Sequence, residues 1–148
     1  MPSFGPESER QLATCSATLQ KLFREVVKRW DCKVLEGKRS QAQQVANVAK
    51  GVSKTLDSKH VTGELPSEAA DVAPFPLKWP VKPKDQTPKE LHRWMKEMAA
   101  FYYFAGYVQG TADQMGIALR YGGDWNGNRS ITDQDFDDLV HFELRGTP

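Results

Sequence analysis

The sequence predicts one α+β domain, in which helices pack on a small, mainly antiparallel β-sheet. Apolar residues recur at three- and four-residue intervals in two long segments, a spacing that lines one face of an amphipathic helix. Short apolar segments of a length typical of strands lie between and after these helices. A chain of 148 residues buries roughly 70% of the surface that its unfolded form exposes, which is enough for one core.

Helices are expected at residues 7–30, 41–50 and 87–115. Ser40 can cap the second helix, and the Thr-Pro-Lys-Glu sequence at 87–90 is typical of a capping box with proline in the first turn. The buried face of the first helix is predicted to hold Leu12, Cys15, Leu19, Leu22, Phe23, Val26, Val27 and Trp30. The buried face of the last is predicted to hold Leu91, Met95, Met98, Tyr102, Ala105, Val108 and Ala112.

A strand is expected at residues 33–37, a short segment that contains a β-branched residue and ends at a glycine, and two more at residues 117–121 and 139–144. Residues 74–86 contain four prolines, which remove backbone donors and fix φ, so this segment is predicted to be an extended loop. Phe75 and Trp79 in this loop either pack beneath it or border a groove.

Composition excludes several classes of protein. A formal net charge of +1 provides no field that would gather nucleic acid, and no run of about 18 apolar residues suggests a membrane span. Cys15 and Cys32 form no ligand pair and are expected to be buried, reduced thiols. The first residues do not resemble a signal peptide, so we expect a protein that stays in the cytoplasm until it is released, and a monomer by default.

Two separate segments carry residues that could bind a metal. Residues 57–71 place a histidine and several carboxylates around a glycine turn, and residues 137–144 carry a second histidine within an apolar strand. A catalytic zinc takes three protein ligands from His and Asp or Glu, and His60, Asp71 and His141 could supply them. The spacing alone does not decide this, because a histidine on a polar segment is commonly only a hydrogen-bonded surface residue.

Three motifs, in order along the chain, resemble those of zinc D-alanyl-D-alanine peptidases. They are residues 36–40 followed by Gln44, residues 58–63 with 69–71, and residues 138–144. Within that family the sequence is most similar to bacteriophage endolysins that act as L-alanyl-D-glutamate endopeptidases. The similarity extends from about residue 15 to residue 144.

This resemblance implies a fold and roles for individual residues. The fold would be that of the D-Ala-D-Ala metallopeptidases, also called Hedgehog-like. The zinc ligands would be His60, Asp71 and His141. Asp138 would be the general base and Arg39 the clamp for the substrate and the transition state, while Ser58 would either contact the substrate or cap a turn.

One departure from the family pattern concerns the carboxylate ligand. Four extra residues separate Gly63 from Ala69, and they bring Glu64 and Glu68 into the loop as rival ligands. We expect Asp71 to be the ligand because Ala69 precedes it, as in the family.

A second metal site is predicted in residues 124–135, where the oxygen-bearing side chains resemble those of a calcium-binding EF-hand loop. The candidate calcium ligands are Asp124, Asn126, Asn128 and Asp135. Arg129 stands where such loops have glycine, and an aspartate replaces the final glutamate, so binding would be weak. The alternative is a polar turn. Bound calcium would order the segment that leads into Asp138 and His141.

These observations predict a zinc-dependent endolysin that hydrolyses the L-alanyl-D-glutamate bond in the peptide stem of peptidoglycan, without a separate wall-binding domain. The alternatives are a D-alanyl-D-alanine carboxypeptidase, a non-catalytic metal-binding module for wall recognition, and a calcium-sensing interaction protein. Trp125 could border a groove for the peptide, whereas His92 is expected to be exposed without a function.

Overall fold

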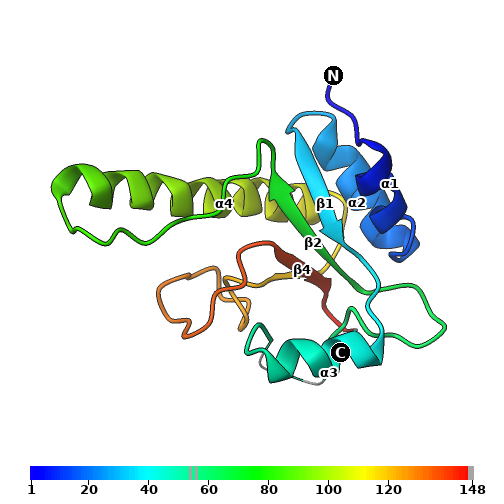
Figure 1. The fold of residues 1–148 in the computed structure, drawn as a ribbon. Coiled ribbons are helices and arrows are strands. Elements are labelled where there is room, and N and C mark those ends of the chain that lie inside the picture. Colours follow the sequence, from blue (N-terminus) through cyan, green and yellow to red (C-terminus); the bar gives the residue numbers. More distant parts are fainter. Residues whose placement is uncertain (54, 56, 147–148) are drawn as a thin grey trace.

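The computed structural model describes residues 1–53, 55 and 57–146. Its elements are α1 (Pro6–Leu12), α2 (Ala17–Val27), β1 (Cys32–Glu36), α3 (Gln41–Ala49), β2 (Ala69–Pro74), α4 (Pro88–Gln114), β3 (Leu119–Tyr121) and β4 (His141–Leu144). The strands form one sheet in the order β1-β2-β4-β3, with every neighbouring pair antiparallel (Figure 1). The predicted α+β class is therefore confirmed. Within the described residues, no helix is both long and apolar enough to cross a membrane.

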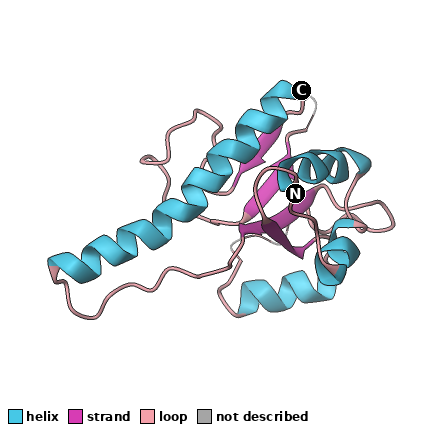
Figure 2. Cartoon of the chain, turned by 90° about the horizontal axis from the view of Figure 1, so that it is seen from above, coloured by secondary structure: helices cyan, strands magenta, loops and turns pink. Residues whose placement is uncertain are grey.

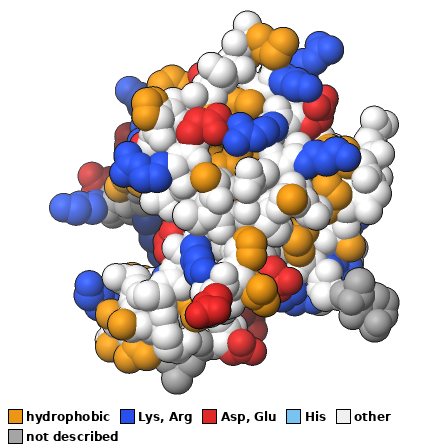
Figure 3. Space-filling view, turned by 90° about the vertical axis from the view of Figure 1, so that its right-hand side faces the viewer, with side chains coloured by type: hydrophobic (Ala, Val, Ile, Leu, Met, Phe, Trp, Pro, Cys, Tyr) orange, Lys and Arg blue, Asp and Glu red, His pale blue; other side chains and the backbone are white. Residues whose placement is uncertain are grey.

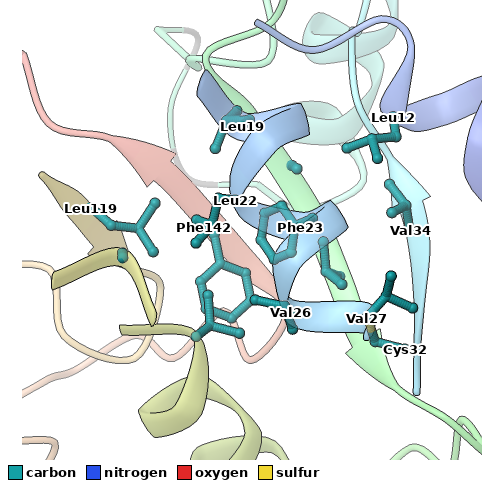
Figure 4. Packing of buried hydrophobic residues seen from close by; sticks show 14 of the residues in the cluster. Leu12, Leu19, Leu22, Phe23, Val26, Val27, Cys32, Val34, Leu119 and Phe142 are labelled. Atoms are coloured by element: carbon teal, nitrogen blue, oxygen red, sulfur yellow. The ribbon is translucent and has the colours of Figure 1, made fainter. Parts of the chain in front are cut away.

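The main core lies between the sheet and the two helices α2 and α4. Phe142 of β4 is at its centre, with its ring 5.6 Å from that of Phe23 and 5.1 Å from that of Tyr121 (Figure 4). Successive residues of a strand point to opposite faces, so Phe142 in the core places His141 and Glu143 on the other face. This alternation leaves one face of the sheet for packing and the other for polar chemistry.

The helix predicted over residues 7–30 is interrupted, and residues 13–16 separate α1 from α2. Ser16 caps α2 by accepting a hydrogen bond from the backbone N–H of Leu19, and its own N–H donates to Ser67. Thr14 accepts a backbone hydrogen bond from Ser67, so the interruption lets the loop before β2 pair with this turn. The apolar stripe was predicted correctly and is buried apart from Trp30, which packs against the core from its edge.

The long helix α4 has the predicted extent, but its first half does not have the predicted buried face. Leu91 and Met95 are 38% and 53% exposed, because this half projects past the sheet with only the proline-rich loop beside it (Figures 1 and 2). The buried side chain there is Glu97, which accepts hydrogen bonds from Arg93 and from the backbone of the loop. In the capping box, Thr87 accepts from the N–H of Glu90 as expected, whereas the Glu90 carboxylate pairs with Arg93.

Strand β2 was not predicted. Three of its six residues are alanine, and it also contains an aspartate and a proline, which are not typical of strands. It lies between β1 and β4 in the sheet, so pairing on both sides stabilises a segment with little strand propensity of its own. The loop after it is irregular, as predicted, and Trp79 stacks on Phe101 with 5.5 Å between ring centres.

The face of the molecule beside α1 and α2 carries a mixture of acidic and basic side chains (Figure 3). No single sign of charge dominates that face, as expected from the small net charge of the chain. Cys15 and Cys32 are buried free thiols, as predicted.

Candidate metal centre

The register between β2 and β4 brings two of the predicted ligands together. Asp71 lies directly opposite His141, and both side chains leave the sheet on the face away from Phe142. Glu36 of β1 is the partner of Asp71 on its other side, after a bulge in β1. One row across three strands therefore carries a glutamate, an aspartate and a histidine.

The third predicted ligand, His60, belongs to the loop before β2 and is 1% exposed. Its backbone oxygen accepts from the N–H of Arg39, and its backbone N–H donates to the hydroxyl of Ser58. Its Nδ1 lies 2.6 Å from the carbonyl oxygen of Gly37, which can only accept, so Nδ1 carries the proton. Nε2 is therefore left with a lone pair, 3.1 Å from Oδ1 of Asp71 and 3.2 Å from Nδ1 of His141.

The outer nitrogen of His141 is also occupied, since its Nε2 lies 2.8 Å from a carboxylate oxygen of Glu143. With both outer nitrogens donating, Nε2 of His60 and Nδ1 of His141 direct two lone pairs and the Asp71 carboxylate at one point. The ligand atoms of His60, Asp71 and His141 all lie within 4.8 Å of one another. Such a set is repulsive unless a proton or a cation lies between its members, and two imidazoles with one carboxylate suit a divalent transition metal.

The pKa shifts of Asp71 and His141 indicate a site that favours a positive charge between them. Burial raises the pKa of Asp71, but the hydrogen bonds with His141 and His60 outweigh it and hold that pKa well below its usual range. Burial lowers the pKa of His141, but hydrogen bonds to Asp71 and Glu143 raise it to about 9. In the absence of a metal, a proton therefore takes the position between the carboxylate and the imidazole.

The rival ligands in the inserted loop do not reach this point. Glu64 and Glu68 are both exposed, and among the described residues the cluster suited to a metal is His60, Asp71 and His141. The insertion packs instead against the turn between α1 and α2, where Ser67 is fully buried and bonded in both directions. The extra length is thus taken up before β2 begins, and Asp71 keeps its place opposite His141.

The proposed base, Asp138, lies in the turn that leads into β4. Its backbone N–H donates to Gly122, and its carbonyl accepts from His141. A Cβ on Gly122 would collide with the backbone of Asp138, so this close approach requires glycine. Asp138 lines the same cleft as the three predicted ligands, a hollow of about 510 Å³. Burial, followed by the charge of Asp71, raises the pKa of Asp138, which favours its action as a proton acceptor and donor.

Arg39 also lines the cleft, and its guanidinium is held by two neighbours. Nε and Nη2 donate to the two carboxylate oxygens of Glu36 at 2.6 and 2.9 Å, and Nη1 donates to Gln44 at 2.6 Å. Three of its five N–H groups are used in these bonds, and two are not bonded to Glu36 or Gln44. Nη2 is 3.9 Å from Asp71, which places this cation at the edge of the metal cluster.

Three residues that support the site lie in the motifs described above, but the sequence analysis gave them no role. Gln44 is fully buried and joins Arg39 to the loop that follows α3, because its amide also donates to Ser53 and Thr55. Glu36 orients Arg39, and Glu143 orients His141. The signal for Glu143 was present, since a residue two positions after a histidine in a strand lies on the same face.

One wall of the cleft is aromatic. Trp125 and Phe136 both line it, with nearly parallel rings, and the indole N–H of Trp125 donates to the carbonyl of Phe136. The Trp125 ring is 5.3 Å from that of His141. Phe75 and Trp79 lie outside the lining of this cleft, and His92 is exposed, as predicted.

The hydrogen bonds of the predicted calcium loop are organised around Asp133, a residue that was not among the predicted ligands. The side-chain amides of Asn126 and Asn128 both donate to Asp133, and the backbone N–H of Arg129 donates to Asp124. Asp124 is 4% exposed, and its Oδ1 is buried with no hydrogen-bond partner among the described residues. The fourth predicted ligand, Asp135, is exposed.

An antiparallel sheet with a His-Asp-His cluster beside a carboxylate in a cleft is an arrangement typical of hydrolases that can bind a metal. The chain belongs to the phage L-alanyl-D-glutamate peptidase family, whose family model matches residues 2–145.

Two similar proteins agree with this membership. The chain is 31% identical over 139 residues to the L-alanyl-D-glutamate peptidase of Escherichia phage T5, with 88% of this chain and 87% of that protein covered. Its structure is similar to the crystal structure of the Serratia marcescens L-Ala D-Glu endopeptidase ChiX, with a TM-score of 0.68 and 25% identity. That comparison covers 97% of this chain and 91% of that chain.

Proposed function

We propose that this protein is a zinc-dependent endolysin that hydrolyses the L-alanyl-D-glutamate amide bond in the peptide stem of peptidoglycan. The family supports the reaction. The observation that carries the metal dependence is the convergence of His60, Asp71 and His141 at one point in the cleft, with both outer imidazole nitrogens occupied. In this proposal the metal is held by Nε2 of His60, Oδ1 of Asp71 and Nδ1 of His141.

Zinc bound to these three atoms would supply a Lewis acid for the scissile carbonyl and for water. Asp138 would accept a proton from the attacking water and return it to the leaving amine, as one carboxyl group can do in both halves of a hydrolysis. The two remaining N–H groups of Arg39 would bind either the carboxylate of the substrate or the oxyanion that develops on the carbonyl. Ser58 would shape the turn that presents His60 and meet the substrate at the rim of the cleft.

The decisive experiment is digestion of purified peptidoglycan by the zinc-loaded protein, with and without a chelator, followed by mass spectrometry of the released ends. New free amino groups on D-glutamate, lost on chelation and restored by zinc, are the expected result. Release of D-alanine would instead identify a carboxypeptidase. A folded, zinc-loaded protein that binds peptidoglycan and cleaves nothing would identify a wall-recognition module.

Two substitutions separate the proposed roles. Asp138→Asn should abolish hydrolysis and leave zinc stoichiometric, because it removes the proton acceptor and none of the ligands. His60→Ala should lose the metal itself. Zinc content by atomic absorption and hydrolysis of a stem tetrapeptide distinguish them, and full activity of the Asp138→Asn protein would exclude this residue as the base.

We also propose that the loop at residues 124–135 binds calcium weakly through Asp124, Asn126, Asn128 and Asp135. The supporting observation is the buried, unpartnered Oδ1 of Asp124, which a cation would satisfy. Binding would require Asp135 to turn inward from its exposed position. Trp125, next to Asp124, lies against His141, so calcium would also affect the aromatic wall of the cleft.

The calcium proposal is tested by titrating calcium into the zinc-loaded protein and recording the tryptophan fluorescence and the calorimetric heat. Saturable binding that Asp124→Asn removes is expected. The same titration with Arg129→Gly should show tighter binding, because glycine is the usual residue at this loop position. Absence of any binding at millimolar calcium would identify the loop as a polar turn.

The remaining proposals concern location and assembly. From the phage family we propose that the protein stays in the cytoplasm of the infected host until it is released to the wall, and that it acts as a monomer. Light scattering of the purified protein tests the second proposal, and fractionation of infected cells before lysis tests the first.

A further inference from the structure

Glu143 is a buried carboxylate in the strand that carries His141. It is 5% exposed, and it lies on the same face of β4 as His141 because the two residues are two positions apart. Its strand partner in β2 is Ala69, whose small side chain leaves room for a large neighbour. A buried carboxylate is costly unless it is bonded and paired, so its partners indicate what it does.

One carboxylate oxygen of Glu143 determines which nitrogen of His141 carries the proton. Oε1 lies 2.8 Å from Nε2 of His141. Glu143 also forms ion pairs with Lys59 and Arg120, and a carboxylate in such pairs only accepts hydrogen bonds. Nε2 therefore donates, and the lone pair is on Nδ1, the nitrogen that faces Asp71 and His60.

The other oxygen, Oε2, lies between two cations from different parts of the chain. Nζ of Lys59 and Nη1 of Arg120 are each 3.6 Å away. Arg120 belongs to β3 and lies directly opposite Glu143 in the sheet. Lys59 is the residue before His60, and its ammonium also donates to the carbonyl of Leu144 at the end of β4.

These contacts join the outer side of the His141 ring to the loop that carries His60. Lys59 precedes His60 in the chain and pairs with Glu143 in the strand of His141. Glu143 therefore contacts both the ring of His141 and the residue beside His60. The inner sides of the same histidines meet at the proposed metal position. Loss of Glu143 would thus free the ring of His141 and leave Lys59 and Arg120 facing each other without an anion between them.

We infer that Glu143 is a positioning residue of the metal centre, which holds His141 with Nδ1 toward the metal and is itself held by Lys59 and Arg120. This inference rests on the proposed function only in taking His141 as a ligand. Outer carboxylates of this kind raise the basicity of a ligand histidine and fix its orientation, and their removal typically weakens metal binding about 10–100-fold.

The test measures zinc affinity by competition with a chromophoric chelator, without reference to hydrolysis. Glu143→Leu should weaken zinc binding about 10–100-fold. Glu143→Gln should lose less, because its amide oxygen can still accept from Nε2. A matched control is Glu97→Gln, another buried carboxylate paired with a cation but located on α4, and it should bind zinc as the unchanged protein does.

A second measurement separates positioning from a merely structural role. Long-range nitrogen–proton NMR spectra of the histidine rings report which nitrogen is protonated. Compared in the same metal-free state at alkaline pH, where the ring is neutral, the unchanged protein should show His141 protonated on Nε2, and Glu143→Leu should show a mixture of the two tautomers. If Glu143→Leu does not fold, Glu143→Gln and Lys59→Met provide the same comparison, each with weaker zinc binding than the Glu97→Gln control.

The outcomes are distinct from those that test the function. Unchanged zinc affinity together with an unchanged His141 tautomer in the Glu143 variants would overturn the inference, whatever the enzyme cleaves. A protein that binds zinc through His141 but hydrolyses no peptidoglycan would overturn the proposed function and leave the role of Glu143 standing.

Discussion

Replacement of Gly37 by alanine should disturb both the fold and the metal centre. Gly37 follows β1, where its N–H donates to the side chain of Gln11 and its carbonyl accepts from His60 at 2.6 Å. A Cβ at this position would lie well inside 3.0 Å of Thr14 Oγ1 and of the backbone oxygen of Gln11, and 2.9 Å from the sulfur of Cys15. A backbone oxygen cannot rotate away, so the turn between α1 and α2 must separate from the strand.

The expected magnitude follows from this geometry. Overpacking of a tight site typically lowers the free energy of unfolding by about 1–3 kcal/mol. Because the added Cβ collides with backbone, Gly37→Ala is expected to lower it by about 3 kcal/mol. For a chain of this size the melting temperature falls by about 2–4 °C per kcal/mol, so a decrease of roughly 6–12 °C is expected. The Gly37 carbonyl accepts the proton of Nδ1 of His60 and so fixes the orientation of this ring, and its displacement should weaken zinc binding. The affinity should fall about tenfold for each 1.4 kcal/mol of binding free energy that is lost.

The assay is urea unfolding of the metal-free and zinc-loaded proteins, with zinc affinity measured in parallel. Gly106→Ala is a matched control, because Gly106 is exposed in α4 and a Cβ there meets nothing within 4 Å. Alanine at that position should stabilise the protein by about 0.5–1 kcal/mol. If Gly37→Ala were as stable as the unchanged protein and bound zinc equally well, the close packing of this strand end against the helical turn would be refuted.

Three further predictions concern the core, the thiols and a helix cap. Phe142→Ala should lower the free energy of unfolding by about 3–5 kcal/mol in denaturant titrations, since the ring is fully buried among other aromatic rings. Burial raises the pKa of Cys15 to about 11 and that of Cys32 to about 12, so at pH 8 both should be alkylated by iodoacetamide far more slowly in the folded protein than in urea, as mass spectrometry would show. Thr87→Ala should cost about 1 kcal/mol through loss of the α4 cap, and an unchanged unfolding midpoint would contradict that role.

Helix ends and strand ends were predictable to different degrees. Ser40 and Thr87 cap their helices as predicted, because a cap depends on a hydroxyl and an N–H only three residues away. The break between α1 and α2 was not predicted, since it depends on pairing with Ser67, fifty residues further along the chain. The same kind of long-range pairing makes a strand of residues 69–74, whose own composition argues against one.

Partnerships within the site were harder to foresee than the residues themselves. The order of the motifs predicted that Arg39 belongs to the site. Only the fold shows that three of its five N–H groups donate to Glu36 and Gln44. Likewise the EF-hand pattern named Asp135, whereas the folded loop turns its amides toward Asp133. Sequence spacing cannot rank neighbours of similar chemistry, because small rotations of the backbone decide which of them faces inward.

By itself, the sequence determined the fold class, the helical segments with the apolar stripe of the first of them, and the identity of the histidines and carboxylates that are available for chemistry. These follow from interactions within a few residues and from the order of the motifs. The tertiary structure alone decided that Asp71 lies opposite His141, that the inserted loop with Glu64 and Glu68 packs away from the cleft, and that Glu143 completes the surroundings of His141. The first and the last depend on strand register, which is set by the burial of Phe142 and its neighbours across the whole sheet rather than by any local segment. The position of the inserted loop depends on the pairing of Ser67 with the turn between α1 and α2.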